Sequence, residues 1–321
     1  MDLDYNYTSK LQPHPERRRE ILGKYPQISQ YFRPYPLSAF YIFLMVSAQF
    51  VIGLLLHYYN VNFMGILLCS YFIGAFINHA LYVMIHESCH NLIFGTPWMD
   101  RLIGIFCDFA LVVPSAMGFR RYHLIHHTHL GEFDFDADLV SKGEGKLVGN
   151  IWWRKFLWMT FFMISQGILR PMRLKKIKMW NKWIVLNLGV IITFDLALLF
   201  YFPWVFGYLA LSTFFALGPH ALGGRWIQEH YTQTDKQETY SYYGPLNKLT
   251  FNMRFHNEHH DFFMAPWINL PKIKKMADEY YRPLISYNCW SKVLINFIFN
   301  PKYSPFSRIV HNKSPNESLE F

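Results

Sequence analysis

The chain has 321 residues, of which 52% are hydrophobic and only 17% are charged. Its mean hydropathy of +0.05 excludes a protein that lies wholly in lipid and predicts one partly embedded in a bilayer and partly in water. The net charge of +9 comes from basic residues interspersed with Trp, Phe and Leu, which favours an anionic membrane surface over nucleic acid as a partner.

Beyond a polar N-terminal segment, residues 1–36, four apolar runs are long enough to cross a membrane. A hydrocarbon core of about 30 Å requires roughly 20 helical residues. Short links join the runs in pairs, which predicts two transmembrane hairpins over residues 37–85 and 183–222. The predicted fold is therefore an all-α polytopic membrane protein with four transmembrane helices. The four runs are residues 37–58, 63–85, 183–202 and 204–222.

The three segments outside the hairpins, residues 1–36, 86–182 and 223–321, are rich in Lys and Arg, whereas neither hairpin link contains one. The positive-inside rule then predicts that all three lie in the cytosol. Two shorter apolar stretches, residues 102–117 and 156–169, are interrupted by polar residues and predict interfacial or buried helices. We interpret the whole chain as one domain, in which a cytosolic helical cap rests on the two membrane hairpins.

The arrangement of the histidines predicts a metal site in this cap. The motif HESCH places two histidines at spacing i, i+4, and HLIHH and HNEHH each place three at i, i+3 and i+4. Side chains at these spacings share one face of a helix. A further histidine follows the fourth apolar run in QEHY. The nine predicted metal ligands are His86, His90, His123, His126, His127, His230, His256, His259 and His260.

Nine imidazoles suit two metal ions, because a single ion takes roughly four to six ligands. Neutral imidazole binds Zn, Cu, Fe and Ni alike. The position of the motifs at the membrane boundary favours a redox metal that oxidises what the bilayer dissolves. Acidic residues interleaved with the motifs are predicted to accept hydrogen bonds from the ligand imidazoles. These residues are Glu87, Glu229, Glu258 and Asp261.

Other interpretations of the histidines remain open. HESCH alone could form a zinc protease site with Glu87 as the general base, although seven histidines would then have no role. Each triplet alone could be a solvated helix face or a pH sensor. A non-catalytic metal-binding or transport protein is a third alternative, although transporters usually place such residues near the membrane midplane.

Several other ionisable residues are given structural roles. His79, His129 and His220 lie close to the ligand segments, and His14, His57 and His311 lie farther from them. The acidic run Asp134, Asp136 and Asp138 could bind a cation, but we interpret it as a solvated loop.

The motifs HESCH, HLIHH and HNEHH match the three histidine boxes of the integral membrane fatty-acid desaturase and hydroxylase superfamily. More narrowly, LQPHPERRREILGKYPQI, and ETYSYYGPLNKLTFN followed by HNEHHDF, resemble the sphingolipid Δ4-desaturases, also called dihydroceramide desaturases. The resemblance runs over about residues 7–307. One departure is Arg225, where animal members commonly have a further histidine.

The resemblance implies an iron pair held by the nine histidines and a dihydroceramide-like substrate that enters from the bilayer. It also implies formation of the 4,5-trans double bond with O2, in the endoplasmic reticulum of a eukaryote or the inner membrane of a bacterium. Reducing O2 to water needs more electrons than the substrate supplies, so an external donor such as cytochrome b5 or a ferredoxin-type protein is expected. A sphingolipid C4-hydroxylase and a fatty-acyl desaturase or hydroxylase remain alternatives, and Zn could replace Fe in overexpressed protein.

Overall fold

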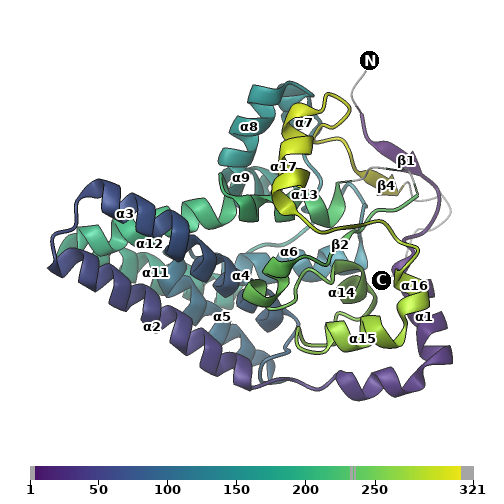
Figure 1. The fold of residues 1–321 in the computed structure, drawn as a ribbon, viewed down its shortest axis with the longest axis horizontal. Coiled ribbons are helices and arrows are strands. Elements are labelled where there is room, and N and C mark those ends of the chain that lie inside the picture. Colours follow the sequence, from purple (N-terminus) through teal and green to yellow (C-terminus); the bar gives the residue numbers. More distant parts are fainter. Residues whose placement is uncertain (1–3, 232–233, 235, 312–321) are drawn as a thin grey trace.

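A bundle of apolar helices extends to the left in Figure 1, and the rest of the chain forms a cap at its right-hand end. The computed structural model describes residues 4–231, 234 and 236–311. Inside the bundle, buried aliphatic side chains of α2, α4, α5 and α11 pack together in one cluster. The bundle elements are α2 (Leu37–Tyr58), α3 (Phe63–Cys69), the π-helical turn η2 (Ser70–Gly74), α4 (Ala75–Cys89), α5 (Pro97–Leu111), α11 (Lys182–Tyr201) and α12 (Pro203–Leu217).

Within the described part of the chain, three helices are long and apolar enough to cross a membrane: Leu37–Tyr58, Phe63–Cys89 and Lys182–Tyr201. They expose large apolar side chains, such as Phe43 of α2 and Phe200 of α11. The fourth predicted run differs, because α12 ends at Leu217 and Gly218 is followed by a proline, which disfavours a continuing helix. Helix α12 is long and apolar enough for a fourth span when it is taken together with the segment Ala221–His230, which follows it after a bend of 44°.

Close contacts and buried polar groups join the bundle helices. A Cβ atom on Gly74 would overlap the Ser212 hydroxyl, so α12 can approach the α3–α4 helix this closely only because residue 74 is glycine. Tyr208 donates a hydrogen bond to Gln49 Oε1 (2.6 Å), and Asn78 donates to Thr213 Oγ1 (2.8 Å). These bonds join α12 to α2 and to α4 in a part of the molecule that offers few other polar partners.

The cap consists of shorter helices. Four elements carry the sequence motifs, and they lie where the cap meets α4 of the bundle. These four elements are α4, α6 (Ala116–Thr128), α13 (Gly224–His230) and α14 (His256–Asp261). The remaining cap elements surround them. They are α1 (His14–Lys24), η1 (Pro26–Tyr31), α7 (Lys142–Val148), α8 (Trp152–Thr160), α9 (Phe162–Ile164), η3 (Ser165–Leu169), α10 (Arg170–Arg173), η4 (Ala221–Gly223), η5 (Pro245–Thr250), α15 (Leu270–Met276), α16 (Asp278–Tyr281) and α17 (Trp290–Phe299).

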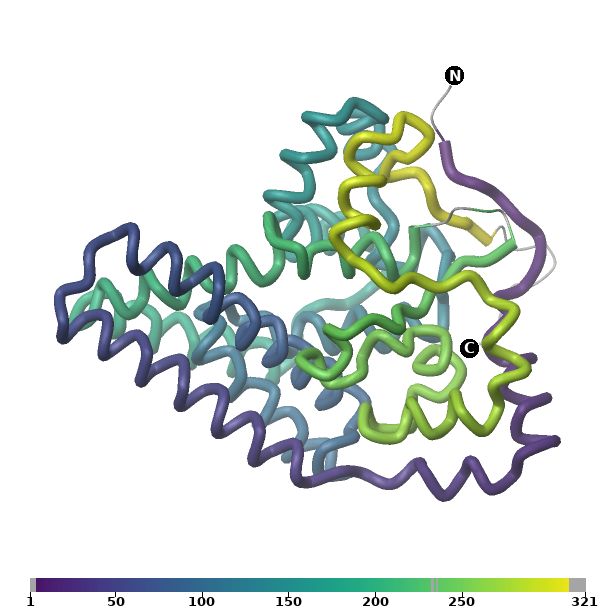
Figure 2. The backbone as a smooth tube through the Cα atoms, in the orientation of Figure 1, coloured from purple at the N-terminus to yellow at the C-terminus, as the bar shows by residue number. Residues whose placement is uncertain are grey.

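Two short parallel sheets depart from the predicted all-α fold. Strand β1 (Asn6–Thr8) pairs with β4 (Ile309–His311), so that the earliest and latest described segments run side by side, as Figure 2 shows. Strand β2 (Ser241–Tyr242) pairs with β3 (Ser286–Tyr287). Strands of two or three residues carry too little alternation of apolar and polar side chains to be recognised from sequence.

Candidate metal centre

Hydrogen bonds at the ends of α4 and α6 bring the first two histidine motifs together. The guanidinium of Arg120, in α6, donates to the carbonyl oxygens of Ser88 and Cys89 at the C-terminus of α4, both at 2.7 Å. A cation is favourable there, because these carbonyls have no partner within their own helix. At its other end α6 begins where Asp108 Oδ2 accepts from the Ala116 amide at 3.0 Å. The interactions fix α6 beside α4.

The third motif is fixed by the segment that precedes it. Glu258, in α14, accepts hydrogen bonds from Ser241 Oγ (2.7 Å) and Tyr243 Oη (2.6 Å). The Tyr240 amide donates to the Glu229 carbonyl at 3.1 Å, which ties the same segment to α13. The YSYY stretch therefore connects the two helices that carry His230 and the HNEHH histidines.

Five imidazoles from α4, the residue that follows it, α6 and α14 converge on one point, and we call them the five-histidine group. One nitrogen of each lies within 4.8 Å of one nitrogen of every other. His123 Nε2 lies 3.0 Å from both His90 Nε2 and His127 Nε2, and His259 Nε2 lies 3.0 Å from His127 Nε2. The members are His86, His90, His123, His127 and His259.

The other four predicted ligands form a second point of convergence, the four-histidine group. His126, His230 and His260 offer nitrogens within 4.8 Å of one another. His256 Nε2 completes the group at 3.0 Å from His230 Nε2. The two groups adjoin, because the rings of His127 and His260 lie 4.4 Å apart between centroids. The structure thus divides the nine histidines into five and four.

The nitrogen positions suit bound cations. Two nitrogens each about 2.1 Å from a metal, at right angles, would lie about 3.0 Å apart, which is the spacing seen here. His260 Nε2 is buried and has no hydrogen-bond partner among the described residues. Burial lowers the pKa of His90 to about 3, and it lowers the pKa of His123 and His259 well below the ordinary value. These imidazoles are therefore neutral, the form that binds metal.

The four acidic residues predicted to orient the imidazoles have different surroundings. Glu87 Oε1 lies 4.0 Å from His86 Nδ1, and Glu229 Oε1 lies 4.0 Å from His256 Nδ1. Glu258 is occupied by its serine and tyrosine donors, and burial raises its pKa to about 7. Asp261 is bonded to α1 rather than to a member of either group.

We interpreted the acidic run that contains Asp136 as a solvated loop, and for Asp136 this interpretation is wrong. Its side chain is fully buried, and its Oδ1 lies 2.9 Å from His126 Nδ1. It is held there by the amides of Gly131 and Asp138, both donating at 2.8 Å. Although burial opposes the charged form of His126, the nearby carboxylates raise its pKa. Asp134, by contrast, is exposed as expected.

His14 was also expected to be remote from the motifs, yet it packs on them. Its Nδ1 lies 2.7 Å from Asp261 Oδ1, and its ring lies 4.9 Å from that of His260. Arg17 donates to the same carboxylate at 2.7 Å. The sequence indicated this packing only through the resemblance of the N-terminal segment to the family. The histidines outside both groups of nitrogens include His79, whose ring nitrogens contact Arg254 and the Ala216 carbonyl.

A cavity of about 410 Å³ joins both histidine groups to the bundle. At one end it is lined by His86 and His123 of the first group and by His126, His230 and His256 of the second. The remaining lining is largely apolar and comes from α5, α9, α11 and α12, among others. It includes Leu111, Val113, Met163, Leu188 and Leu217. A chain of methylenes could therefore lie with one part in the bundle and another against the histidines.

Comparisons with known proteins identify the family. The model of the fatty acid desaturase family matches residues 61–291, and the Sphingolipid Delta4-desaturase model matches residues 2–37. The chain is 41% identical to proteins named sphingolipid delta(4)-desaturase DES1-like from Oryza sativa subsp. japonica and Arabidopsis thaliana. These matches cover 96% and 98% of this chain and 92% and 93% of those proteins.

The sphingolipid delta(4)-desaturase DES1 of Homo sapiens is 36% identical, over 99% of this chain and 98% of its own length. The family and the apolar helices together identify an integral membrane protein. The chain belongs to the sphingolipid Δ4-desaturases within the fatty acid desaturase family.

Proposed function

We propose that this protein is a desaturase that converts dihydroceramide to ceramide by forming the 4,5-trans double bond. The observation that carries the proposal is the cavity, because its wall joins the apolar interior of the bundle to both histidine groups. The names of the relatives supply the substrate class and the position of the double bond. A lipid that enters from the bilayer would expose its reacting methylenes only where the imidazoles line the wall.

We further propose that each histidine group holds one iron ion, with all nine histidines as ligands. Bound there, an iron pair would supply the oxidising chemistry that removes hydrogen from an unactivated methylene, which no side-chain acid or base can do. The protein's own part is to orient the nine imidazoles. Asp136 does so for His126 by accepting from its Nδ1, so that Nε2 faces the site.

The apolar wall has a second task, which is to exclude water from the reacting methylenes. Met163, Ile164 and Leu217 present apolar surface to a lipid chain along this part of the cavity. In the overall reaction, one hydrogen leaves C4 and one leaves C5, and the substrate loses two electrons. Reduction of O2 to two waters takes four electrons and four protons. The other two electrons and two protons must come from outside the substrate.

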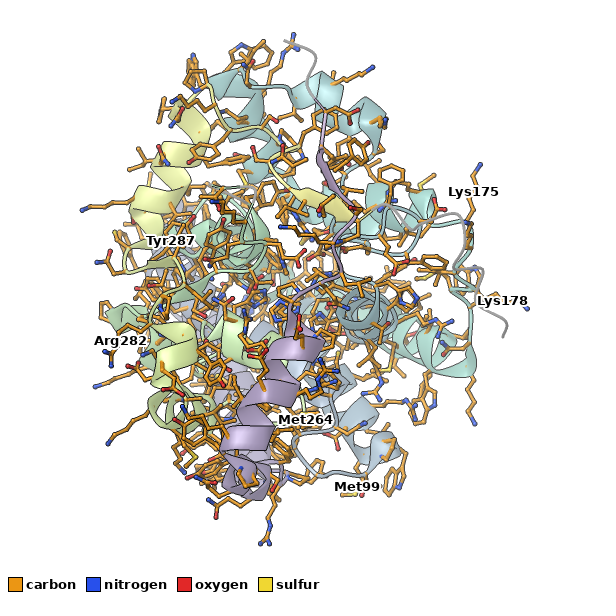
Figure 3. The ribbon with its side chains drawn as sticks, turned by 90° about the vertical axis from the view of Figure 1, so that its right-hand side faces the viewer. Met99, Lys175, Lys178, Met264, Arg282 and Tyr287 are labelled. Atoms are coloured by element: carbon orange, nitrogen blue, oxygen red, sulfur yellow. The ribbon has the colours of Figure 1, made fainter. Side chains whose placement is uncertain are left out.

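An external electron-carrier protein, such as cytochrome b5 or a ferredoxin-type protein, is therefore part of the proposal. The cap carries exposed basic side chains: Lys175 and Lys178 project outward at one edge of the view in Figure 3, and Arg282 projects at the opposite edge. Exposed basic side chains favour encounter with an acidic carrier and make its rate fall as salt rises.

We propose that the cap faces the cytosol, with four spans, in the endoplasmic reticulum of a eukaryote or the inner membrane of a bacterium. The support is the absence of Lys and Arg from the hairpin links. Cysteines introduced singly at Asn60, in the exposed α2–α3 link, and at exposed Lys175 should react with an impermeant thiol reagent from opposite sides of sealed vesicles. Reaction of both from the same side would contradict the four-span arrangement, and the unmodified protein controls for its own four cysteines.

The reaction is tested with purified protein, dihydroceramide, O2 and a reduced electron carrier, with the products separated by mass spectrometry. Ceramide is the expected main product. Deuterium at C4 should slow turnover more than deuterium at C5 if the C4 hydrogen leaves first. If 4-hydroxydihydroceramide dominates, the protein is a hydroxylase with the same metal site. If only a fatty acyl substrate is oxidised, the substrate assignment is wrong as well.

A further inference from the structure

Arg225, in α13, lies where the cavity meets the histidines. Its side chain is almost entirely buried, with 3% of its surface exposed, and it lines the cavity. Its Nε donates to Glu229 Oε1 at 2.7 Å, and its guanidinium carbon lies 4.7 Å from the Trp226 ring centroid. The helix that carries it ends with the ligand candidate His230. The positively charged guanidinium of Arg225 is thus fixed about one helical turn from the four-histidine group.

One hydrogen-bond donor of this guanidinium is unused. Among the described residues, Arg225 Nη1 is buried and has no hydrogen-bond partner. A buried charged donor without an acceptor is costly, so a protein retains one where something else supplies the acceptor. Glu229 cannot neutralise the region by itself, because Arg254 Nη1 also lies 3.5 Å from the same oxygen, Oε1. Two guanidiniums therefore share one carboxylate, and the excess charge is positive.

We propose that Arg225 Nη1 donates a hydrogen bond to an oxygen of the lipid's polar head, and so sets which methylene faces the histidines. The inference rests on the proposed function. In a sphingoid lipid the hydroxyl and amide oxygens are on or beside the first three carbons of the chain. A donor that holds one of them at the histidine end of the cavity brings the next methylenes, C4 and C5, to the imidazoles. The remaining chain then runs along the apolar wall.

The test combines a change in the protein with a change in the lipid. Arg225→Met removes the donor and keeps the length of the side chain, and Arg225→Lys keeps a charge opposite Glu229 should the first variant fold poorly. Each is assayed with dihydroceramide and with three analogues, which lack the C1 hydroxyl, the C3 hydroxyl or the amide carbonyl. Kinetics, the position of the double bond, bound metal and Tm are measured for every variant.

On dihydroceramide we expect kcat/KM of Arg225→Met to fall about 10- to 100-fold, as for loss of a hydrogen bond to a charged group. The double bond should also scatter to neighbouring positions, with bound metal unchanged. On the analogue that lacks the contacted oxygen, the variant and the wild type should differ little, because the interaction is already absent. Arg254→Met is the matched control, since it removes the other cation beside Glu229 but does not line the cavity.

An equal loss on all four lipids, with the double bond still at one position, would overturn the proposal and leave Arg225 a structural role. The Arg254→Met control is expected to behave in that way. If the wild type itself oxidises none of the sphingolipids, the proposed function fails first and the role of Arg225 falls with it.

Discussion

The two histidine groups are made of the same side chain but differ in what surrounds it. In the five-histidine group the nearest predicted acid, Glu87, lies 4.0 Å from His86 Nδ1 and accepts its hydrogen bond from the Trp267 amide instead. In the four-histidine group, oxygens of three carboxylates lie within 4.0 Å of imidazole nitrogens. They belong to Asp136, Asp138 and Glu229.

The difference indicates that the two positions are chemically unequal. A carboxylate that accepts from an imidazole N–H makes the other ring nitrogen a stronger donor to metal, and negative charge nearby favours a more highly charged ion. The five-histidine group offers more nitrogens instead. We expect the four-histidine group to depend on its carboxylates and the five-histidine group to depend on the number of its ligands.

The side chains that lie over the two histidine groups also differ. The ring of His14 lies 4.9 Å from that of His260, over the four-histidine group. The ring of Phe263 lies 5.7 Å from His90 and 5.4 Å from His127, and the guanidinium of Arg18 lies over it at 5.7 Å. One group is thus covered by an imidazole tied to a carboxylate and the other by an apolar ring.

The largest effect is expected from removing one ligand of either group. His126→Ala should empty the four-histidine group and His259→Ala the five-histidine group, and each should abolish desaturation, because both ions are needed. Elemental analysis of protein made with iron available should show about one iron in each variant and about two in the wild type. His129→Ala is the control, since it lies on the same stretch of chain as His126 but outside both groups. One zinc and no iron in the wild type would favour the protease interpretation.

A smaller effect is expected from the carboxylate behind His126. Asp136→Asn should weaken metal retention in the four-histidine group about 10- to 100-fold, as is typical when the acceptor behind a ligand imidazole is lost. The five-histidine group should keep its ion, which competition with a chelator would reveal as two phases. Asp134→Asn is the matched control, because Asp134 is exposed and pairs with exposed Lys176. Equal loss from both groups would remove the distinction between them.

The smallest effect is expected from the cover of the four-histidine group. Arg17→Ala removes two hydrogen bonds to buried Asp261, from Nε and Nη2, and leaves the contact with His14. Loss of this buried ionic contact should lower the free energy of unfolding by about 3 kcal/mol. Thermal unfolding in detergent measures this, with Lys24→Ala as control because its pair with Glu279 is exposed. A Tm drop in Lys24→Ala as large as that in Arg17→Ala would show that the buried pair contributes nothing special.

Features that depend on short-range spacing could be predicted from the sequence. The apolar runs at 37–58 and 183–202 became α2 and α11 within a residue or two, because length and composition suffice for such helices. The second run was expected to continue as a helix through the HESCH motif, but the helix ends at Cys89, one residue before the last histidine of the motif. The spacing within each motif predicted which histidines share a helix face, but not how the nine divide between two groups.

Features that depend on distant contacts could not be predicted. Asp136 is buried because Arg173 and Arg308, 37 and 172 positions away, contact its carbonyl or its carboxylate. His14 meets Asp261 across 247 positions, and no local pattern indicates that contact. The end of α12 at Leu217 was missed because composition favoured a span, although Gly218 and the following proline were visible in the sequence.

The pairing of β1 with β4 has a consequence for the order of events during synthesis. The five-histidine group needs the chain only as far as His259, whereas the loop behind His126 is closed by Arg308, just before β4. Roughly 50 residues separate these points, on the order of several seconds of translation. While the ribosome is still working, a nascent chain could therefore complete one metal position, but not the surroundings of the other. Loading of the four-histidine group should then await the arrival of the last strand.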